Sequence, residues 1–451
     1  MMMVIGGGPA GRIAAIELAQ GRRDGEEVIL IERRTAGLGG QCLHAGCMVV
    51  CALNDLARHL VQARMFYEDG IVTTPVSFSY PHVLDRLHDV QTKLASIMHT
   101  ETVNAGVTIL SGDASVSRKV VTVNGNVYTP DSLLIATGTT PHLPSIPGIE
   151  LDGIYTAHTV LSNRELPSNL VIVGGGVIAV EFAYIFAQCG VHVTIVARSS
   201  LLRGQPSYLV AGVRADLADV SIIEEADIQA CTEADPGSGR VGSVTIQVDG
   251  EKRLIPADMV FFAVGSRPNT AQIQGIACNA AGEILINERM ETSVPGVYAA
   301  GDICGPPLLA TYARYQGRVA ASAMLGRDLP PRPKVISQAI KLHYEHGWCG
   351  LPQSDESDES DLLQAGMPSL IGSGSIWKLG HISTGKSILT AKKDGTIVSM
   401  YESSPVGSLA AAYMGYLIEY GITAKELASM FEVHPSPDGM HWLAKYLAGK
   451  M

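Results

Sequence analysis

The chain starts with a short apolar run that ends in glycines. Met2 to Ile5 is apolar at every position, as is typical of a buried parallel strand, and Gly6 to Gly11 is typical of a turn. Arg12 to Gln20 then predicts a helix, and Val28 to Glu32 predicts the next strand. These segments together predict one βαβ unit of a dinucleotide-binding fold.

The same arrangement returns in the middle of the chain. Leu170 to Val173 predicts a strand, Gly174 to Gly176 a turn, Val177 to Gln188 a helix and Val191 to Val196 another strand. Two dinucleotide folds in one chain imply two bound nucleotides. We therefore expect an α/β protein with two Rossmann-like units.

Other segments indicate how the chain is divided. Ser132 to Gly138 predicts a buried strand that ends in a tight turn, and Met259 to Val264 predicts another strand, which runs into Gly265. Pro330 to Pro333 is a stiff linker and a natural boundary. The part that follows, Lys334 to Met451, predicts a mixed α/β module.

Composition narrows the class of protein. A chain of 451 residues is too long for one compact core, so about two to three domains are expected. The net charge of -11 gives no electrostatic basis for binding nucleic acid or acidic membranes. The eight cysteines lack the density of a secreted disulfide scaffold, so we expect a reducing, cytoplasmic location.

The apolar segments predict neither a membrane span nor a leader. Leu409 to Ile418 is too short to cross a bilayer, and Gly6 to Pro9 interrupts the N-terminal apolar run. Met1 leads directly into the first strand, which leaves no room for a signal peptide. The acidic run Asp355 to Asp361 is expected to be a solvated loop.

The first glycine turn carries a nucleotide-binding pattern. Gly6-x-Gly8-x-x-Gly11 lets the chain turn tightly and lets a pyrophosphate approach the start of the helix. Glu32, about twenty residues further on, can hydrogen-bond a ribose hydroxyl.

Two cysteines follow a glycine pair shortly after this acid. Cys42 and Cys47 stand five residues apart behind Gly39 and Gly40. A thiol pair at this spacing can close a small ring with little strain, so it can be reduced and re-formed during turnover. Its place beside a nucleotide motif predicts a redox dithiol next to a flavin.

These motifs resemble those of a known family. Gly6-x-Gly8-Pro9-Ala10-Gly11 followed by Gly39-Gly40-x-Cys42-x-x-x-x-Cys47 is similar to the class I pyridine nucleotide-disulfide oxidoreductases, which include dihydrolipoamide dehydrogenase, glutathione reductase and mercuric reductase. The resemblance covers nearly the whole chain. It implies a discontinuous FAD-binding domain (1–148 and 256–328), an inserted NAD(P)-binding domain (149–255) and a C-terminal α+β dimerisation domain (334–451), and hence a homodimer.

The resemblance also implies roles. Hydride would pass from a nicotinamide nucleotide through FAD to the Cys42–Cys47 disulfide and on to a disulfide or dithiol substrate, with Cys42 as the exchange thiol and Cys47 facing the flavin. His434 would serve the partner subunit as acid and base. The residues expected to bind FAD are Gly6, Gly8, Pro9, Ala10, Gly11, Glu32, Arg33, Gly40, Gln41, Cys42, Ala136, Thr137, Gly138, Gly301 and Asp302.

The second glycine turn bears on the choice of nicotinamide nucleotide. Ala197 stands where an NAD-selective site carries an acid, and Arg198 and Ser199 follow it. A guanidinium suits a 2′-phosphate, so NADPH is favoured over NADH, although a merely solvent-facing arginine is the alternative. The residues expected at this second site are Gly174, Gly176, Val177, Ile178, Glu181, Arg198, Ser199 and Gly265.

The chain departs from the family pattern after the second cysteine. The usual Pro-Ser-Lys is replaced by Met48-Val49-Val50-Cys51, so Cys51 stands at the lysine position and Glu181 lacks its lysine partner. Cys51 lies one helical turn after Cys47, and it is either a third thiol facing the flavin or a small buried hydrophobe. The thiols match no standard zinc pattern, and no metal site is predicted.

The C-terminal histidine segment also departs from the pattern. Gly439 stands where a glutamate normally orients the imidazole of the residue at His434, and Asp438 comes one residue early. Two other functions therefore stay open at this point. One is a flavin-dependent reductase of a metal ion, a quinone or oxygen, and the other is a flavin electron-transfer or redox-sensing subunit that docks on a protein partner.

Overall fold

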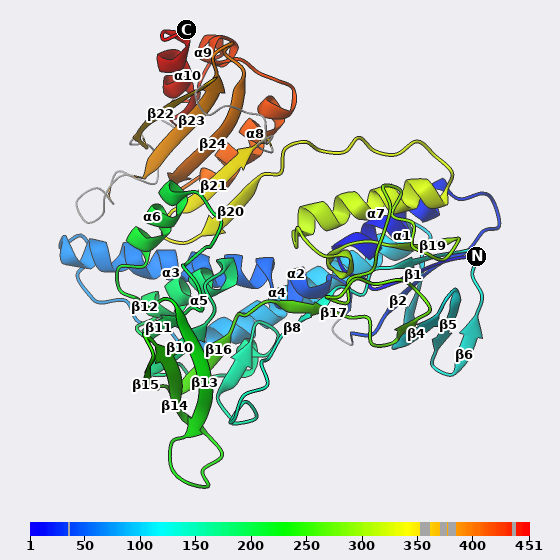
Figure 1. Cartoon of the computed structure of the whole chain (residues 1–451), viewed down its shortest axis with the longest axis horizontal. Coiled ribbons are helices and arrows are strands. Elements are labelled where there is room, and N and C mark those ends of the chain that lie inside the picture. The colour runs from blue at the N-terminus through cyan, green and yellow to red at the C-terminus, as the bar shows by residue number, and fades with distance from the viewer. Residues whose placement is uncertain (35–36, 352–360, 370–376, 378–384, 435–438) are drawn as a thin grey trace.

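The computed structural model describes residues 1–34, 37–351, 361–369, 377, 385–434 and 439–451. Its strands form two five-stranded parallel sheets, a five-stranded antiparallel C-terminal sheet and several smaller sheets (Figure 1). The C-terminal sheet stands above a layer of helices, with the second parallel sheet on the far side of that layer.

The first parallel sheet has the strand order β19-β7-β1-β2-β3. β1 (Met2–Ile5) lies between β2 (Val28–Glu32) and β7 (Ser132–Ile135), and every residue of β1 and β2 is buried. The outer strands are β19 (Val297–Ala299) and β3 (Thr108–Ser111). The apolar runs that predicted β1 and β2 therefore coincide with the strands.

Two helices pack on this sheet and on each other. Ala14 and Leu18 of α1 (Pro9–Gly21) share a buried cluster with Val319 of α7 (Ala310–Met324) (Figure 1). α1 begins earlier than predicted, at Pro9, because the fixed φ of proline suits the first turn of a helix.

The second parallel sheet has the order β12-β11-β10-β16-β9. β10 (Asn169–Val173) is central, and α5 (Val177–Gln188) follows it over the predicted range. β11 (His192–Val196) begins one residue later than predicted, and β16 (Met259–Phe262) ends before Val264. The chain turns at Gly265, where φ is +98°, and the predicted positions Ala263 and Val264 fall outside the strand.

The C-terminal sheet is antiparallel, with the order β20-β21-β24-β23-β22. Its strands are β20 (Gln338–Lys341), β21 (Glu345–Gly350), β22 (Leu362–Pro368), β23 (Lys386–Lys392) and β24 (Ile397–Ser404). α8 (Gly407–Glu419) and α10 (Met440–Ala448) pack on it, with Met414 and Met440 in their shared core.

A layer of helices lies between the sheets. α2 (Gly40–His44) and α3 (Cys47–Glu68) follow each other closely, and α4 (Tyr80–Asn104) runs nearby (Figure 1). Val49 and Leu53 of α3 share a buried cluster with Phe182 of α5 and with Ile340 and Leu342 from the start of the C-terminal sheet. The helix that carries the second cysteine is therefore packed against both the second sheet and the C-terminal sheet.

The other helices and strands have the following bounds. They are β4 (Ala114–Ser117), β5 (Val120–Val123), β6 (Asn126–Tyr128), β8 (Thr139–Pro141), β9 (Ile154–Thr156), β12 (Ser221–Ile223), β13 (Ala226–Glu233), β14 (Val241–Val248), β15 (Glu251–Pro256), β17 (Ser266–Pro268), β18 (Ile273–Gln274), α6 (Ser207–Asp216), α9 (Ala424–Ser429) and 3-10 turns at Val160–Ser162 and Asp302–Cys304.

Several other expectations concern single segments. The apolar stretch Leu409 to Ile418 lies within α8, and within the described part of the chain no helix is long and apolar enough to cross a membrane. Of the acidic run, Asp361 is described: it is exposed and pairs with Lys393 at 2.8 Å. The rest of that run lies outside the described residues.

A buried polar contact joins α6 to the C-terminal sheet. The ring of His346 lies 3.0 Å from Asp216 through Nε2 and 2.9 Å from the Tyr401 hydroxyl through Nδ1. Asp216 also accepts the backbone N–H of Tyr344 at 3.1 Å. His346 is fully buried, so its ring nitrogens cannot reach water, and these two contacts supply their hydrogen-bond partners instead.

Replacing Asp216 with alanine should therefore destabilise the protein. We expect the free energy of unfolding to fall by about 2–3 kcal/mol, because the Tyr344 N–H and the His346 ring lose a buried acceptor. Urea unfolding of Asp216→Ala measures this loss. Asp89→Ala is the matched control, since Asp89 pairs with Arg86 on an exposed helical surface and should contribute less than about 0.5 kcal/mol. Equal losses in the two variants would contradict the prediction.

Candidate active site

The turn after β1 is built so that only glycine fits at its first position. Gly6 has φ of +105°, and a Cβ there would lie 2.2 Å from the carbonyl oxygen of Ala136. The buried carboxylate of Glu32 accepts the N–H of Gly7 at 2.9 Å and that of Arg34 at 2.8 Å. Glu32, which the sequence predicted to bind a ribose, thus holds the turn in place. Its neighbour Arg33 is exposed.

The loop that carries the thiols lies directly against this turn. A Cβ on Gly40 would come within 2.6 Å of the Cα of Gly8, and Gly39 donates its N–H to the carbonyl of Gly7 at 2.9 Å. Gln41 beside them has a buried Oε1 without a hydrogen-bond partner among the described residues. A narrow backbone cradle with an unused polar atom fits a bound dinucleotide, which would supply that partner.

The end of β19 completes the cradle from the other side. Gly301 has φ of +83°, and a Cβ there would lie 3.1 Å from the Cβ of Ala10. Its N–H donates to Gln316 Oε1 at 2.8 Å, and Gln316 is buried. Burial raises the pKa of the neighbouring Asp302. Gln316 was not among the predicted site residues, because its partner at Gly301 is a backbone N–H.

The predicted Ala136-Thr137-Gly138 segment lies against Asn269, the residue that follows β17. Asn269 donates Nδ2 to the Thr137 carbonyl at 2.8 Å, and Thr137 donates its hydroxyl to the Asn269 carbonyl at 3.1 Å. Asn269 also donates its N–H to Gly138 O at 2.9 Å. Its Oδ1 also accepts the Thr140 hydroxyl at 2.7 Å. Asn269 therefore anchors this edge of the site, which the sequence did not reveal because most of these contacts involve a backbone group.

The two cysteines lie in consecutive helices. Cys42 is in α2, and Cys47 is the first residue of the long helix α3, where the unpaired N–H groups favour negative charge. A hydrogen bond with Cys47 lowers the pKa of Cys42 to about 7; the charge of Arg314 also lowers it, and burial opposes both effects. The same hydrogen bond and burial raise the pKa of Cys47. The reduced pair therefore shares one proton and carries a thiolate near neutral pH.

This shared proton predicts the pH dependence of the reduced thiols. Alkylation of Cys42 by iodoacetamide should rise about tenfold per pH unit below pH 7 and level off above it, because the thiolate is the nucleophile. Mass spectrometry of the reduced enzyme after timed quenching measures the rate at each cysteine. The internal control is Cys278, which is exposed and whose pKa is raised by burial, so its rate should still climb above pH 9. Parallel profiles at the two residues would contradict the shared proton.

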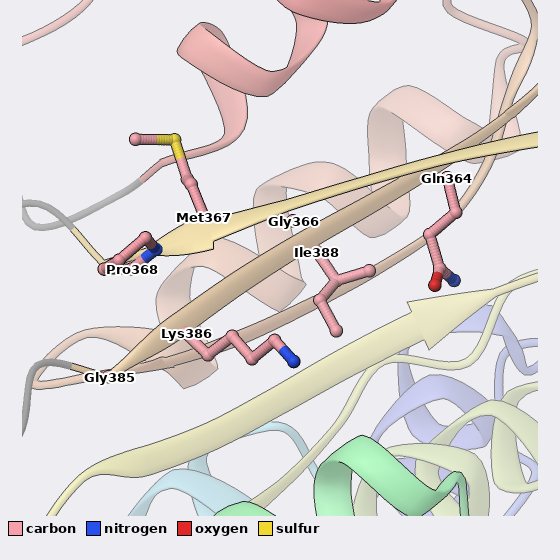
Figure 2. Close-up of a pocket in the computed structure, with 7 residues that line it drawn as sticks. All are labelled: Gln364, Gly366, Met367, Pro368, Gly385, Lys386 and Ile388. Carbon is pink, nitrogen blue, oxygen red and sulfur yellow. The ribbon is translucent and has the colours of Figure 1, made fainter.

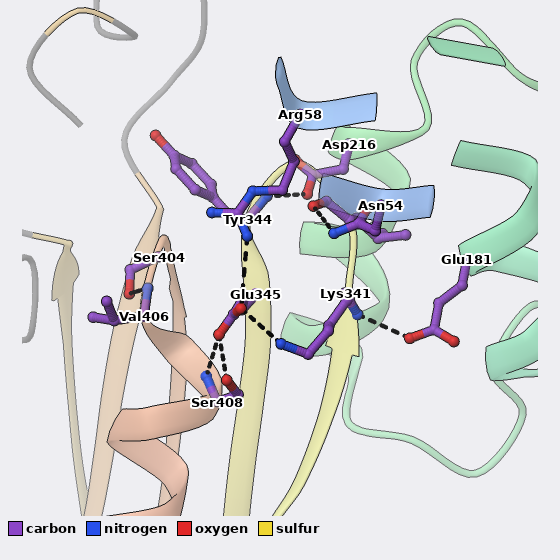
Figure 3. A network of polar contacts seen from close by, with 11 residues as sticks. Asn54, Arg58, Glu181, Asp216, Lys341, Tyr344, Glu345, Ser404, Val406 and Ser408 are labelled. Carbon is purple, nitrogen blue, oxygen red and sulfur yellow. Dashed lines mark hydrogen bonds and ion pairs between the residues drawn. The ribbon is translucent and has the colours of Figure 1, made fainter. Parts of the chain in front are cut away.

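Cys51 and Glu181 lie beside the second thiol. Cys51 follows Cys47 by one turn of α3, and burial raises its pKa, which Cys47 and Glu181 raise further. Burial also raises the pKa of Glu181 to about 7. Its Oε1 accepts the backbone N–H of Lys341 at 3.0 Å, as Figure 3 shows. The carboxylate that lacks the usual lysine partner is thus met by a backbone donor from β20.

The second glycine turn repeats the geometry of the first. Gly174 has φ of +133°, and a Cβ there would lie 2.3 Å from the carbonyl oxygen of Ala263. Gly176 caps α5, and Val177 and Ile178 at the start of this helix are exposed. After β11, Ala197 is buried against Gly175, whereas Arg198 is exposed and Ser199 is half-buried. This turn therefore has the form of a second nucleotide site.

His434 lies apart from the thiols within one chain. It is exposed in the segment between α9 and α10, and these two helices lie at the end of the C-terminal module far from α2 (Figure 1). Asp438 lies outside the described residues. Gly439 is buried, and a Cβ there would lie 2.5 Å from Ser387 Oγ, so the position favours glycine over the glutamate of the family pattern.

The C-terminal sheet also has a hollow of its own (Figure 2). It is open, about 530 Å³ in volume, and contains none of the predicted site residues. Its lining residues are Gln364, Gly366, Met367, Pro368, Gly385, Lys386 and Ile388. In the described part of the chain, no group of three or more His, Cys, Asp or Glu side chains is arranged to hold a metal ion.

Two glycine turns on parallel sheets, with a dithiol lying over the first of them, define an enzyme that binds two dinucleotides and cycles a disulfide. The chain belongs to the pyridine nucleotide-disulphide oxidoreductase family, whose sequence model matches residues 1–317. It is thus an FAD-dependent oxidoreductase that uses a nicotinamide nucleotide. The predicted family, fold class and enzyme class are confirmed.

Individual relatives agree with this assignment. The chain is 30% identical to a dihydrolipoyl dehydrogenase of Geobacillus stearothermophilus, over 96% of this chain and 93% of the relative. It is 29% identical to the enzyme of that name from Bacillus subtilis over the same shares. In structure it is similar to the HOCl-induced flavoprotein disulfide reductase RclA from Escherichia coli, with a TM-score of 0.85, 21% identity and 99% of each chain covered. LpdA from Mycobacterium tuberculosis gives a TM-score of 0.85 at 22% identity, again with 99% of each chain covered.

Proposed function

We propose that this enzyme accepts hydride from NADPH and delivers the electrons through FAD and the Cys42–Cys47 pair to a disulfide substrate, in the manner of a dihydrolipoamide dehydrogenase. The observation that carries the proposal is the contact between Gly40 and Gly8, which lays the thiol loop over the first nucleotide turn. The dihydrolipoyl dehydrogenases that align over nearly the whole chain support a small dithiol or disulfide as the substrate class.

The residues of the cradle suit the roles that FAD requires. Gly6, Gly8 and Gly11 would admit its pyrophosphate at the start of α1, and Glu32 would meet a ribose. Asp302 and Gln41 would face the other half of the molecule. When bound, FAD accepts hydride from the nicotinamide nucleotide and passes electrons to a disulfide.

The chain's own thiols then carry out the exchange. The Cys42 thiolate attacks one sulfur of the substrate disulfide, which forms a mixed disulfide and releases the other sulfur as a thiolate. Cys47 then loses the proton that the pair shares, and its thiolate attacks Cys42, which releases the second substrate sulfur and re-forms the Cys42–Cys47 disulfide. The two leaving thiolates take up this proton and one more from solvent, and His434 of a partner subunit is our candidate for the group that transfers them.

The domain division and the dimer are part of the proposal. We infer an FAD domain (1–148 and 256–328), a nucleotide domain (149–255) and a dimerisation domain (334–451). Exposed apolar side chains on the C-terminal module support a second copy as its partner: they include Leu409, Tyr416, Tyr420, Phe431, Val433, Trp442 and Tyr446. A cytoplasmic location stays a prediction from the scattered cysteines.

An anaerobic titration tests the proposed function. Purified flavoprotein is titrated with NADPH and separately with NADH while reducing equivalents per flavin and the visible spectrum are recorded. Uptake of two electrons beyond those of the flavin, together with a long-wavelength thiolate–flavin band, is the expected result. Uptake that stops at the flavin would remove the dithiol from the electron path and favour an electron-transfer or sensing role.

Arg198 is expected to set the preference for NADPH. Removing the guanidinium in Arg198→Ala should raise KM for NADPH by about 10- to 100-fold and leave KM for NADH nearly unchanged, because only NADPH carries the 2′-phosphate. Steady-state kinetics with both nucleotides measures the change. Arg253→Ala removes another exposed arginine, on β15, and serves as the matched control. An equal change for both nucleotides would contradict this role.

A further inference from the structure

The short helix that carries the first thiol is held at its end by a side chain from another helix. Gln91 of α4 is buried, and its Nε2 donates to the carbonyl oxygen of Leu43 at 2.9 Å and to that of His44 at 3.2 Å. These carbonyls belong to the last two residues of α2, the helix that contains Cys42. The amide of Gln91 therefore caps the C-terminus of α2.

A helix as short as α2 needs such a cap. The last carbonyl groups of an α-helix have no partner within the helix, and α2 has only five residues, so its own hydrogen bonds hold it weakly. Carbonyl oxygens accept and do not donate, so the group that meets both of them must be a donor. The NH₂ group of Gln91 provides two N–H bonds without adding a charge.

A second contact joins α2 to the loop before it. The ring Nε2 of His44 lies 3.1 Å from the carbonyl oxygen of Leu38, so this nitrogen is the donor. Leu38 is itself buried against the first nucleotide turn, where a Cβ on Gly7 would lie 2.4 Å from its Cδ2. His44 stands between the two cysteines in the sequence, and it ties the last residue of α2 back toward this turn.

The helix that carries Gln91 is anchored on both sides of it. Toward the start of α4, Leu84 shares a buried cluster with Leu53 of α3, the helix of the second thiol. Toward its end, Thr102 is buried and accepts the side-chain Nε of Arg12 from α1 at 3.1 Å. One helix thus supports both the short helix of the first thiol and the long helix of the second, and so fixes their relative position.

We propose that Gln91, with His44 as a second tie, is a positioning residue of the redox pair. By capping α2 it holds Cys42 close to Cys47 while both are thiols. In the disulfide state the covalent bond itself holds α2 against α3, whereas in the dithiol state α2 depends on noncovalent contacts such as these. The cap therefore favours the disulfide and lowers the midpoint potential of the pair. For its effect on turnover, the inference rests on the proposed function.

The equilibrium with dithiothreitol tests the proposal in the FAD-bound holoenzyme. Dithiothreitol gives two electrons and two protons to the Cys42–Cys47 disulfide, which opens to two thiols, while the reagent closes to its cyclic disulfide. Acid quenching, alkylation and mass spectrometry measure the fraction of open pairs at each ratio of reduced to oxidised reagent.

The test variant is Gln91→Met, which keeps the size of the side chain and removes both N–H donors. The equilibrium should shift about tenfold toward the dithiol, because the capping hydrogen bonds no longer order α2 when the thiols are free. A tenfold shift raises the midpoint potential by about 30 mV. A wild-type equilibrium in Gln91→Met overturns the proposal.

Thr102→Val is the matched control on the same helix. Thr102 is fully buried, and the change removes the hydroxyl that accepts Arg12 and donates to the carbonyl of Met98 at 2.6 Å. It should therefore lower the free energy of unfolding without moving the thiol equilibrium. A merely structural role for Gln91 would make the two variants alike, so an equal shift in both overturns the proposal.

A milder variant decides if Gln91→Met does not yield folded holoenzyme. His44→Leu removes the ring nitrogen that binds the Leu38 carbonyl and leaves the Gln91 cap in place, at a half-buried position. A shift of about threefold toward the dithiol, as expected for one hydrogen bond, supports the proposal. An unchanged equilibrium, or a shift toward the disulfide, overturns it.

The outcomes also separate this inference from the proposed function. A wild-type enzyme that takes up electrons beyond the flavin, with Gln91→Met unshifted, overturns the role of Gln91 and leaves the disulfide reductase function intact. A wild-type enzyme that takes up no electrons beyond the flavin overturns the proposed function. The thiol equilibrium requires no hydride transfer, so it still decides the role of Gln91 in that case.

Discussion

Replacing Cys47 with serine is expected to abolish disulfide reduction while leaving hydride uptake by the flavin intact. The change removes the sulfur at the start of α3, so no disulfide can form with Cys42 and the mixed disulfide cannot be resolved. Loss of an essential nucleophile lowers turnover steeply, and we expect a decrease of at least about a thousandfold with a disulfide substrate.

The anaerobic titration of Cys47→Ser gives a second readout. Uptake should fall by the two electrons of the dithiol and stop at the flavin, without a thiolate–flavin band. Cys278→Ser is the matched control, since Cys278 is an exposed cysteine that is not among the predicted site residues, and its loss should change neither readout. Turnover by Cys47→Ser within tenfold of wild type would exclude the pair from the mechanism.

Replacing Gly6 with alanine is expected to be the most damaging change to the fold and to FAD binding. The new Cβ would lie 2.2 Å from the carbonyl oxygen of Ala136 and 2.8 Å from its carbon, and both are backbone atoms. Neighbouring backbone cannot yield without disturbing the pairing of β1 with β7. We expect a loss of about 3 kcal/mol or more in the free energy of unfolding and a markedly lower flavin content.

Gly25→Ala is the matched control for this change. Gly25 also has positive φ, +82°, but a Cβ there would meet no heavy atom within 4 Å. Both variants carry the penalty of a left-handed backbone, about 1 kcal/mol, so their difference isolates the clash. Urea unfolding and the flavin absorbance per protein measure the two effects. Similar losses in both variants would show that the turn can relax, which would contradict the rigid cradle.

Much of the fold was predictable because its signals are local. The strands Met2–Ile5 and Val28–Glu32 and the helix Val177–Gln188 are found where the sequence placed them. Each is a mainly apolar segment, and the signals that mark it, its apolar residues and the glycines beside it, lie close together in the sequence. Errors occurred at ends, as at Pro9 and after Phe262, where a cap or a turn decides the last residues.

The site was predictable only where residue types mark the chemistry. The glycine turns are recognisable by the spacing of their glycines. The acid at Glu32 and the thiols Cys42 and Cys47 are recognisable by their residue types and by their distance along the chain from the first turn. Asn269 and Gln316 escaped notice because they bind backbone groups at Thr137 and Gly301. A backbone donor or acceptor is present at nearly every residue, so its use leaves no pattern in the sequence.

The sequence by itself determined the two βαβ units, their glycine turns, the spacing of Cys42 and Cys47 and the departure from the family pattern at Cys51. Only the tertiary structure decided which groups lie around Cys51 and Glu181. The backbone N–H of Lys341 binds Glu181, and the Lys341 ammonium binds Glu345. Packing of α3 against α5 and β20 brings these groups together across a large separation along the chain. Electrostatic interactions depend on distance in space, which local periodicity does not encode.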